Sequence, residues 1–173
     1  MFEILNIFMV VFNLYIAVVL LRIALQWVRA DYHNPLSQFV IKLTQFPIKL
    51  FHKVLPYKKG LDWAALMYVF VLVLIKSFIL AQGSPIHLLL IALFGFVSQI
   101  MDFYFYILLI TAIASWVSQG GVHPVIEALN AIVRPILRPI RRILPSIAGL
   151  DFSPVVAIIL IKLIEVALFT VLF

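Results

Sequence analysis

The chain has 173 residues, of which 65% are hydrophobic and only 12% charged, and it contains no cysteine. Ordinary soluble domains have about 45–50% apolar and about 25% charged residues, so a chain of this size could not bury so much apolar surface in water. The composition therefore excludes a secreted disulfide-bonded scaffold, a disordered chain and a typical soluble enzyme. It is typical of a small, all-α integral membrane protein.

Four stretches are long enough to cross a membrane as helices. A span needs about 20 mainly apolar residues for a hydrocarbon core of about 30 Å. The candidates are about 5–28, 63–81, a segment inside 86–117, and 153–173. A single helix over 86–117 would be about 48 Å long, which exceeds the bilayer. We therefore expect 86–98 to be an outer-surface or tilted segment and about 94–117 to be the span, with two separate crossings as the alternative.

Two loops carry the positive charge of the chain. The segment 29–62 has six Lys or Arg against two Asp, a net charge of +4, and 118–152 has four Arg against one Glu and one Asp, a net charge of +2. Loops rich in Lys and Arg stay in the cytoplasm. The pattern predicts four crossings, with both basic loops inside and both termini outside. Anionic headgroups are the expected partner, and nucleic acid is not, because the basic residues alternate with apolar ones rather than with aromatic stacking platforms.

An internal repeat is visible at a constant offset of 89 positions (116 − 27). Residues that recur in the same order are Trp27-Val28 with Trp116-Val117, Leu55-Pro56 with Leu144-Pro145, and Gly60-Leu61-Asp62 with Gly149-Leu150-Asp151. Each half reads as span, basic amphipathic loop, span. We expect one membrane domain over 1–173, with repeat 1 at about 1–84 and repeat 2 at about 85–173. Two crossings per repeat predict parallel copies related by an axis near the membrane normal.

Both basic loops have apolar residues at a spacing of three to four, which is typical of helices lying in the membrane surface. We expect Pro47, Pro135 and Pro139 to kink or break these helices. They either cap the bundle from inside or recognise lipid or a cytoplasmic partner. Candidate lipid-binding or partner-binding residues are Lys42, Lys49, Lys53, Arg134, Arg138, Arg141 and Arg142.

Each loop ends in a motif that suits re-entry into the membrane. A glycine permits a tight reversal, Asp or Ser caps the following helix, and proline suits its first turn. The residues concerned are Gly60, Asp62, Gly149, Asp151, Ser153 and Pro154. We expect no catalytic role for either Asp, because no base or nucleophile accompanies it. The sequence also lacks nucleotide-binding and hydrolase motifs, and its histidines lack metal-ligand spacing, so no enzyme activity, cofactor or metal is expected.

Four charged residues fall in the outer half of the predicted spans: Lys76, Asp102, Lys162 and Glu165. Arg22 lies nearer the inner boundary, within snorkelling reach. Unpaired charges at such depth cost several kcal/mol, so we expect pairing, with Lys162 and Glu165 spaced for contact on one helix. Lys76 and Glu165 are equivalent in the repeat (165 − 76 = 89) and are expected to meet directly or through Asp102 and Lys162. The cluster is interpreted as a salt-bridge network that fixes helix packing, as an ion or proton pathway, or as snorkelling side chains.

The motifs resemble those of a known family. The segment 134–145, RPILRPIRRILP, followed by 149–154, GLDFSP, is similar to the signature of YggT proteins, also called YlmG. The segments 21–27, LRIALQW, and 34–40, NPLSQFV, fit the same pattern in the first half, where the arginine-rich motif is degraded. The resemblance covers nearly the whole chain. It implies a protein of bacterial inner membranes or plastids, and in an inner membrane the charge pattern described above predicts periplasmic termini.

The resemblance also implies several roles that do not agree on one activity. The family is linked to osmotic-shock tolerance and potassium uptake, to cell division and nucleoid placement, and in plastids to haem attachment. Our leading hypothesis is a non-enzymatic scaffold or assembly factor that uses the basic helices, with a protein partner that the sequence does not identify and a possible homo-oligomer. The alternative is a small transport or channel component affecting potassium or osmolytes.

Overall fold

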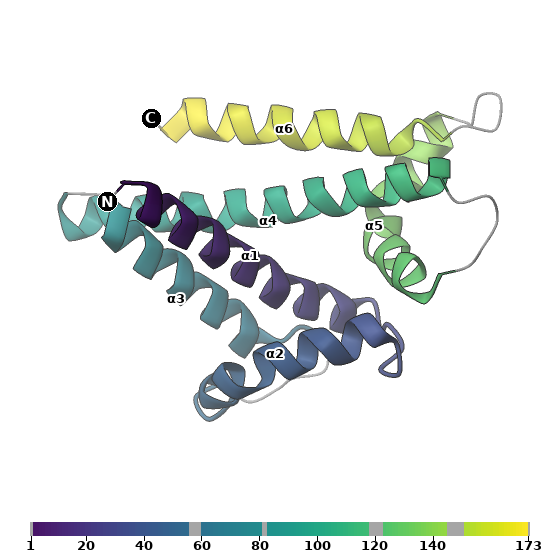
Figure 1. Cartoon of the computed structure of the whole chain (residues 1–173). Helices are drawn as coiled ribbons and strands as arrows, with labels where there is room; N and C mark the ends of the chain where they lie inside the picture. The colour runs from purple at the N-terminus through teal and green to yellow at the C-terminus, as the bar shows by residue number, and fades with distance from the viewer. Residues whose placement is uncertain (1, 56–59, 81–82, 118–122, 145–150, 173) are drawn as a thin grey trace.

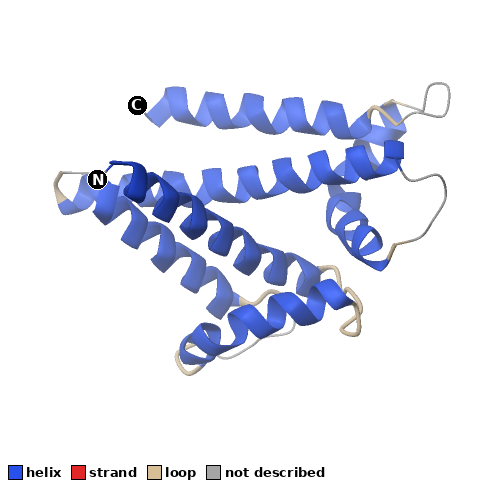
Figure 2. Ribbon diagram, viewed as in Figure 1, coloured by secondary structure: helices blue, strands red, loops and turns tan. Residues whose placement is uncertain are grey.

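The computed structural model describes residues 2–55, 60–80, 83–117, 123–144 and 151–172. The elements in these residues are all helices, as the composition predicts (Figure 1; Figure 2). In chain order they are α1 (Phe2–Trp27), α2 (Pro35–His52), α3 (Trp63–Leu80), α4 (Pro85–Val117), α5 (Pro124–Ile143) and α6 (Ser153–Leu172).

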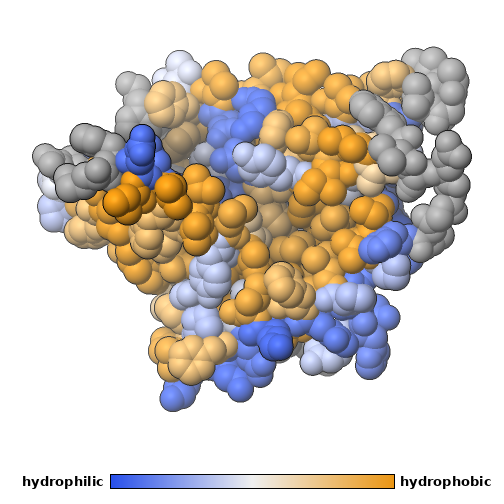
Figure 3. All heavy atoms as spheres, viewed as in Figure 1, coloured by the Kyte–Doolittle hydropathy of each residue, from blue (hydrophilic) through white to orange (hydrophobic). Residues whose placement is uncertain are grey.

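Four of these helices, α1, α3, α4 and α6, are long and apolar enough to cross a membrane. The long α4 packs against α1 and α3 on one side and against α6 on the other. Figure 1 shows both chain termini at one end of these helices, while α2 and α5 join the opposite ends of the helices that they connect. Many apolar side chains of the four helices face outward, which gives the surface its broad hydrophobic area (Figure 3). Such a surface suits a lipid environment.

The third apolar stretch differs from expectation, because α4 is one continuous helix of 33 residues. The alternative of two separate crossings is therefore wrong, and 86–98 is not a helix apart from the span, whereas the expectation of a tilted segment remains a prediction. A helix of this length, about 50 Å, exceeds a hydrocarbon core of about 30 Å, so we expect it to tilt and to extend into the headgroup region. Gly95 lies within it, and a β-carbon at that position would stand 3.2 Å from Cγ1 of Val73. The glycine therefore allows α3 to pack closely against α4.

The amphipathic helices α2 and α5 begin with the same type of cap. The side chain of Asn34 accepts a hydrogen bond from the backbone N–H of Leu36, at 2.9 Å, and Nδ1 of His123 accepts one from Val125, at 3.3 Å. A proline follows each cap, where its missing N–H costs nothing.

Both helices continue through their internal prolines, so the expected breaks at Pro47, Pro135 and Pro139 are not found. A proline removes one backbone hydrogen bond, but tertiary packing holds the helix on both sides of it. Ile48 directly follows Pro47 and is fully buried, and Leu137 lies between the two prolines of α5 and is also buried.

The core lies where the amphipathic helices meet the spanning helices. Its buried apolar residues come from α1 to α5, joined by Ala157 of α6. The centre contains Ile16 and Val19 of α1, Val69 of α3 and Leu108 of α4, all without exposed surface. The inner faces of α2 and α5 close this core, so both helices are structural parts of the bundle.

Candidate functional site

The charges within the spans form a network between α4 and α6. Lys162 Nζ lies 2.7 Å from Oδ1 of Asp102 and 2.8 Å from Oε2 of Glu165. The other oxygen of Glu165 accepts a hydrogen bond from Ser98 Oγ at 2.5 Å. Lys162 also lies 4.8 Å from the centre of the Phe105 ring, where a cation is favoured. One lysine thus neutralises two carboxylates. Residues on two successive turns of α4, Ser98 and Asp102, contact α6.

Lys76 is placed differently from expectation. Its Nζ donates a hydrogen bond to Oδ1 of Asn13 at 2.8 Å, and no ion pair in the described part of the chain joins it to Glu165. The Lys76 side chain thus contacts α1, outside the network of Asp102, Lys162 and Glu165. The sequence interpretation missed Asn13 and Ser98. The repeat offset could have found Asn13, because it stands 89 positions before Asp102 (102 − 13), as Lys76 does before Glu165 (165 − 76).

The aspartates that end the two loops both cap the helix that follows. Asp62 is 1% exposed, and its Oδ1 accepts from the backbone N–H of Ala65 at 3.1 Å. Its Oδ2 lies 3.4 Å from Nε2 of His52 at the end of α2. Gly60 has a φ of 113°, which is the left-handed region that glycine adopts at a tight reversal.

The second loop has the same arrangement, a capping aspartate next to a basic side chain, but its two charged groups lie closer together. Asp151 Oδ1 accepts from the backbone N–H of Ser153 at 2.9 Å, and Oδ2 lies 2.7 Å from Nη2 of Arg141. Partial burial works to raise the pKa of Asp151, but hydrogen bonds from Ser153 and Arg141 outweigh it and hold that pKa below its ordinary value. Pro154 is the second residue of α6, and Gly149 lies outside the described residues.

The two basic helices expose different surfaces. In α5 the apolar face is buried in the bundle, while Arg134, Arg138 and Arg142 are exposed. In α2 the lysines Lys42, Lys49 and Lys53 are also exposed. However, α2 additionally leaves an apolar stripe uncovered, which consists of Phe39, Leu43, Phe46 and Leu50, with Phe46 82% exposed. In the described part of the chain, the one large apolar side chain of α5 that is exposed is Ile143 at its end, so α2 has the longer apolar stripe free to enter a lipid interface beside its lysines.

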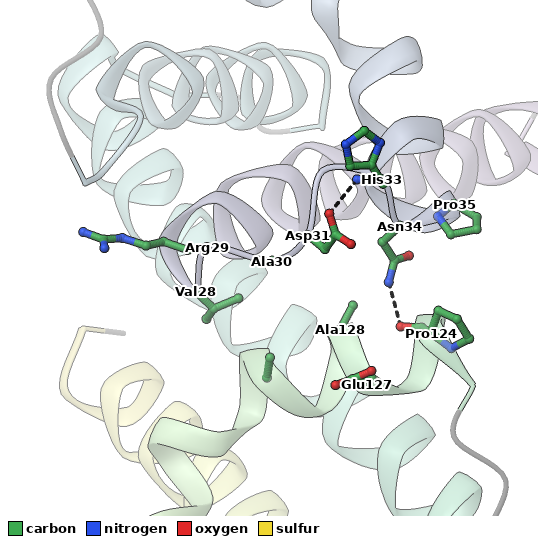
Figure 4. A pocket seen from close by; sticks show the side chains of 11 residues that line it. Val28, Arg29, Ala30, Asp31, His33, Asn34, Pro35, Pro124, Glu127 and Ala128 are labelled. Carbon is green, nitrogen blue, oxygen red and sulfur yellow. Dashed lines mark hydrogen bonds between the residues drawn. The ribbon is translucent and has the colours of Figure 1, made fainter.

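Two surface cavities adjoin α5. One of about 360 Å³ is lined by Trp27, Tyr104, Arg134 and Arg138. The other, of about 500 Å³, lies where α2 and α5 begin (Figure 4). There Asn34 Nδ2 donates to the backbone oxygen of Pro124 at 2.7 Å, which joins the starts of the two amphipathic helices.

The same junction does not have the character of a metal centre. Asp31 is engaged by the backbone N–H of His33 at 2.9 Å, and Figure 4 shows Arg29 pointing away from the Asn34–Pro124 contact. Within the described residues, no group of three His, Cys, Asp or Glu side chains could hold a metal ion.

Four apolar helices long enough to span a bilayer, joined by two amphipathic helices, define an all-helical membrane protein. The sequence comparisons give its family. The CCB3/YggT family model matches residues 1–83 and 90–172. The chain therefore belongs to the CCB3/YggT family, as the motif resemblance predicts.

Similar proteins come from several bacteria. The uncharacterized protein YggT of Escherichia coli K12 is 40% identical over 164 residues, which cover 94% of this chain and 87% of that protein. A Vibrio alginolyticus protein, described as uncharacterized and in the proC 3′ region, is 39% identical over 86% of this chain and 83% of its own length. An uncharacterized protein of Pseudomonas aeruginosa is 34% identical over 88% and 81%. No solved structure matches the chain.

Proposed function

We propose that this chain is a non-enzymatic scaffold or assembly factor of the bacterial inner membrane, with α2 and α5 on the cytoplasmic surface. The observation that carries the proposal is that α5 has a buried apolar face and an exposed basic face. Its apolar residues Leu129, Ile132, Val133 and Leu137 are already buried in the bundle, while Arg134, Arg138 and Arg142 remain exposed. Arginines in this position are available for anionic headgroups and for acidic surfaces of a protein partner.

The charge pattern supports the orientation in this proposal. Both net positive loops lie at the same end of the bundle, and both termini lie at the other (Figure 1). The positive-inside rule puts that basic end in the cytoplasm and the termini in the periplasm. The osmotic-shock and cell-division links implied by the family resemblance fit an assembly factor that joins lipid to a partner.

We also propose that the two halves are parallel repeats. Two contacts recur at the offset of 89: the pair His52–Asp62 with Arg141–Asp151, and the Asn34 cap with the His123 cap. The positions equivalent to the bonded pair Asn13–Lys76 are Asp102 and Glu165, which both contact Lys162. Chance similarity among apolar residues does not produce matching polar contacts at one offset. The repeat explains why each half places its amphipathic helix under its own pair of spans.

A crosslinking experiment tests the scaffold proposal. A photoreactive residue replacing Arg138 in the intact protein, in native membranes, is expected to capture a defined protein. Capture should fall when Arg134 and Arg142 are changed to glutamine. A photoreactive residue at Ile159, which is exposed on α6, is the control for non-specific capture. Capture of the same proteins at both positions, or none at Arg138, would contradict the proposal.

A second candidate function is a small transport or channel component. The observation in its favour is that Lys162 and Asp102 remain 40% and 38% exposed at the side chain although they lie within spanning helices. A second copy packed on this face would bury them and would provide the space for a pathway that one four-span chain lacks. Potassium flux in proteoliposomes that disappears with Glu165→Gln would favour transport, and absence of flux in the wild type would exclude it.

A further inference from the structure

A separate cavity lies between the end of α1 and the start of α2. Its volume is about 260 Å³. Its lining includes three polar residues with buried polar atoms, Arg22 and Gln26 of α1 and Ser37 of α2. The remaining lining consists of Leu25, Ala30, Tyr32, Val40 and Ile41. None of these residues belongs to α5, so the cavity is independent of the arginine face described above.

Three polar atoms of this lining are buried without a hydrogen-bond partner in the described part of the chain: Nε of Arg22, Oε1 of Gln26 and Oγ of Ser37. Ser37 is only 5% exposed. An unpaired buried polar atom costs about 1–3 kcal/mol, and native proteins contain few of them. Three such atoms on residues that line one cavity leave hydrogen-bonding capacity beside it, which a polar occupant would satisfy once the side chains turn toward it.

The guanidinium of Arg22 is held in place for this role. Its Nη1 donates to Oγ1 of Thr44 at 3.0 Å, and that hydroxyl in turn donates to the backbone oxygen of Val40 at 2.7 Å. No carboxylate in the described residues forms an ion pair with Arg22. Asp62 acts on it only from a distance, because its oxygens lie against Ala65 and His52. The positive charge is therefore fixed and without a direct counter-ion.

The position of Ser37 adds to the preference for an anion. Ser37 lies in the first turn of α2, an 18-residue helix, where the helix dipole is positive. Both Arg22 Nε and Ser37 Oγ can donate hydrogen bonds, whereas Gln26 presents an acceptor. The complementary ligand thus accepts two hydrogen bonds through an oxyanion and donates one through a hydroxyl group.

We infer that the cavity between Arg22, Gln26 and Ser37 binds a phosphate group that also carries a hydroxyl. Hydrogen phosphate and the phosphoglycerol headgroup of an anionic lipid share this chemistry. The cavity is smaller than the roughly 300–1,000 Å³ of sites for drug-sized molecules, so it accommodates a headgroup and not a whole lipid. The offset positions in the second half are Thr111, Ser115 and Ile126, which lack the arginine and provide internal controls.

The test uses the purified full-length chain with two probes. Binding of inorganic phosphate is measured by titration calorimetry in a neutral detergent. Binding of phosphatidylglycerol is measured as lipid retained in native mass spectrometry, after incorporation in nanodiscs that contain equal amounts of phosphatidylglycerol and phosphatidylcholine. We expect the chain to retain phosphatidylglycerol in preference to phosphatidylcholine, or to bind inorganic phosphate saturably. If both probes bind, loss of retained phosphatidylglycerol on addition of phosphate shows that they share one site.

The key variant is Ser37→Ala, because it removes one hydroxyl and leaves every charge in place. It should weaken binding of the retained probe about tenfold, as expected for a lost hydrogen bond to a charged group. Ser115→Ala should bind as the wild type does. Arg138→Gln should leave the dependence on Ser37 intact, which separates this inference from the proposed role of α5.

Two results would overturn the inference. One is a wild-type chain that binds neither phosphate nor phosphatidylglycerol in preference to phosphatidylcholine. The other is a folded Ser37→Ala variant with undiminished binding. Either would mean that water alone fills the cavity. If Ser37→Ala does not fold, Gln26→Leu provides the same comparison from α1, with the same expected loss.

Discussion

Arg141, at the end of α5, forms an ion pair with Asp151, which directly precedes α6, and the two groups approach to 2.7 Å. His52 and Asp62, both 89 positions earlier (141 − 52 and 151 − 62), lie 3.4 Å apart at the corresponding place in the first half. In each half, a basic side chain at the end of the amphipathic helix thus holds the aspartate that caps the next span. These contacts fix how α2 and α5 lie under the bundle.

Asp151→Asn should reduce stability by about 0.5–1 kcal/mol, because the pair that it removes is partly exposed. The pKa of Asp151 is lowered in the folded protein, so its contribution is complete above the ordinary value of 3.8 and is lost as pH falls through the lowered value. Thermal unfolding in detergent, measured between acidic and neutral pH, checks this. The variant should lose that part of the pH dependence, while Arg142→Gln, at a neighbouring exposed arginine, should retain it.

Asp62→Ala should cost more than Asp151→Ala. Asp62 is almost fully buried, so its loss removes the cap of α3 and leaves the Ala65 amide without its partner, at a cost of about 2–3 kcal/mol. The ordering can be measured by unfolding both variants under identical conditions. Equal losses of unfolding free energy in the two variants would contradict the prediction that the buried cap at Asp62 contributes more than the partly exposed cap at Asp151.

Lys162→Met should destabilise the chain by about 2–3 kcal/mol, since it leaves two carboxylates within spanning helices without a cation. Adding Asp102→Asn and Glu165→Gln should recover part of the loss. Lys76→Met is the matched control. This lysine donates a hydrogen bond to the neutral Asn13, so its removal leaves no carboxylate without its ion-pair partner. A triple variant less stable than Lys162→Met alone would contradict this account of the network.

Much of the architecture follows from local sequence properties. Apolar runs, proline positions and capping residues predicted the spans α1, α3 and α6 to within a few residues, because these signals act within one helix. The continuity of α4 was missed because the thickness of the bilayer was taken as a limit on the length of a spanning helix, although a tilted helix can exceed that thickness.

Side-chain partners were harder to predict. The Lys162–Glu165 pair follows from spacing along one helix, but the Lys76–Asn13 contact depends on how α1 and α3 are rotated about their axes. The cavity at Arg22 and Ser37 arises from residues of two helices, and periodicity within either helix does not reveal it.

The cytoplasmic location of the basic helices is the central claim, and single-cysteine labelling tests it directly, since the chain has no cysteine of its own. Lys53→Cys and Arg142→Cys mark the ends of α2 and α5, and Ser84→Cys marks the exposed turn before α4. With a membrane-impermeant thiol reagent applied to spheroplasts, the account predicts labelling of Ser84→Cys only, and labelling of the other two only in inverted vesicles. Labelling of Lys53→Cys or Arg142→Cys from outside intact spheroplasts would contradict it.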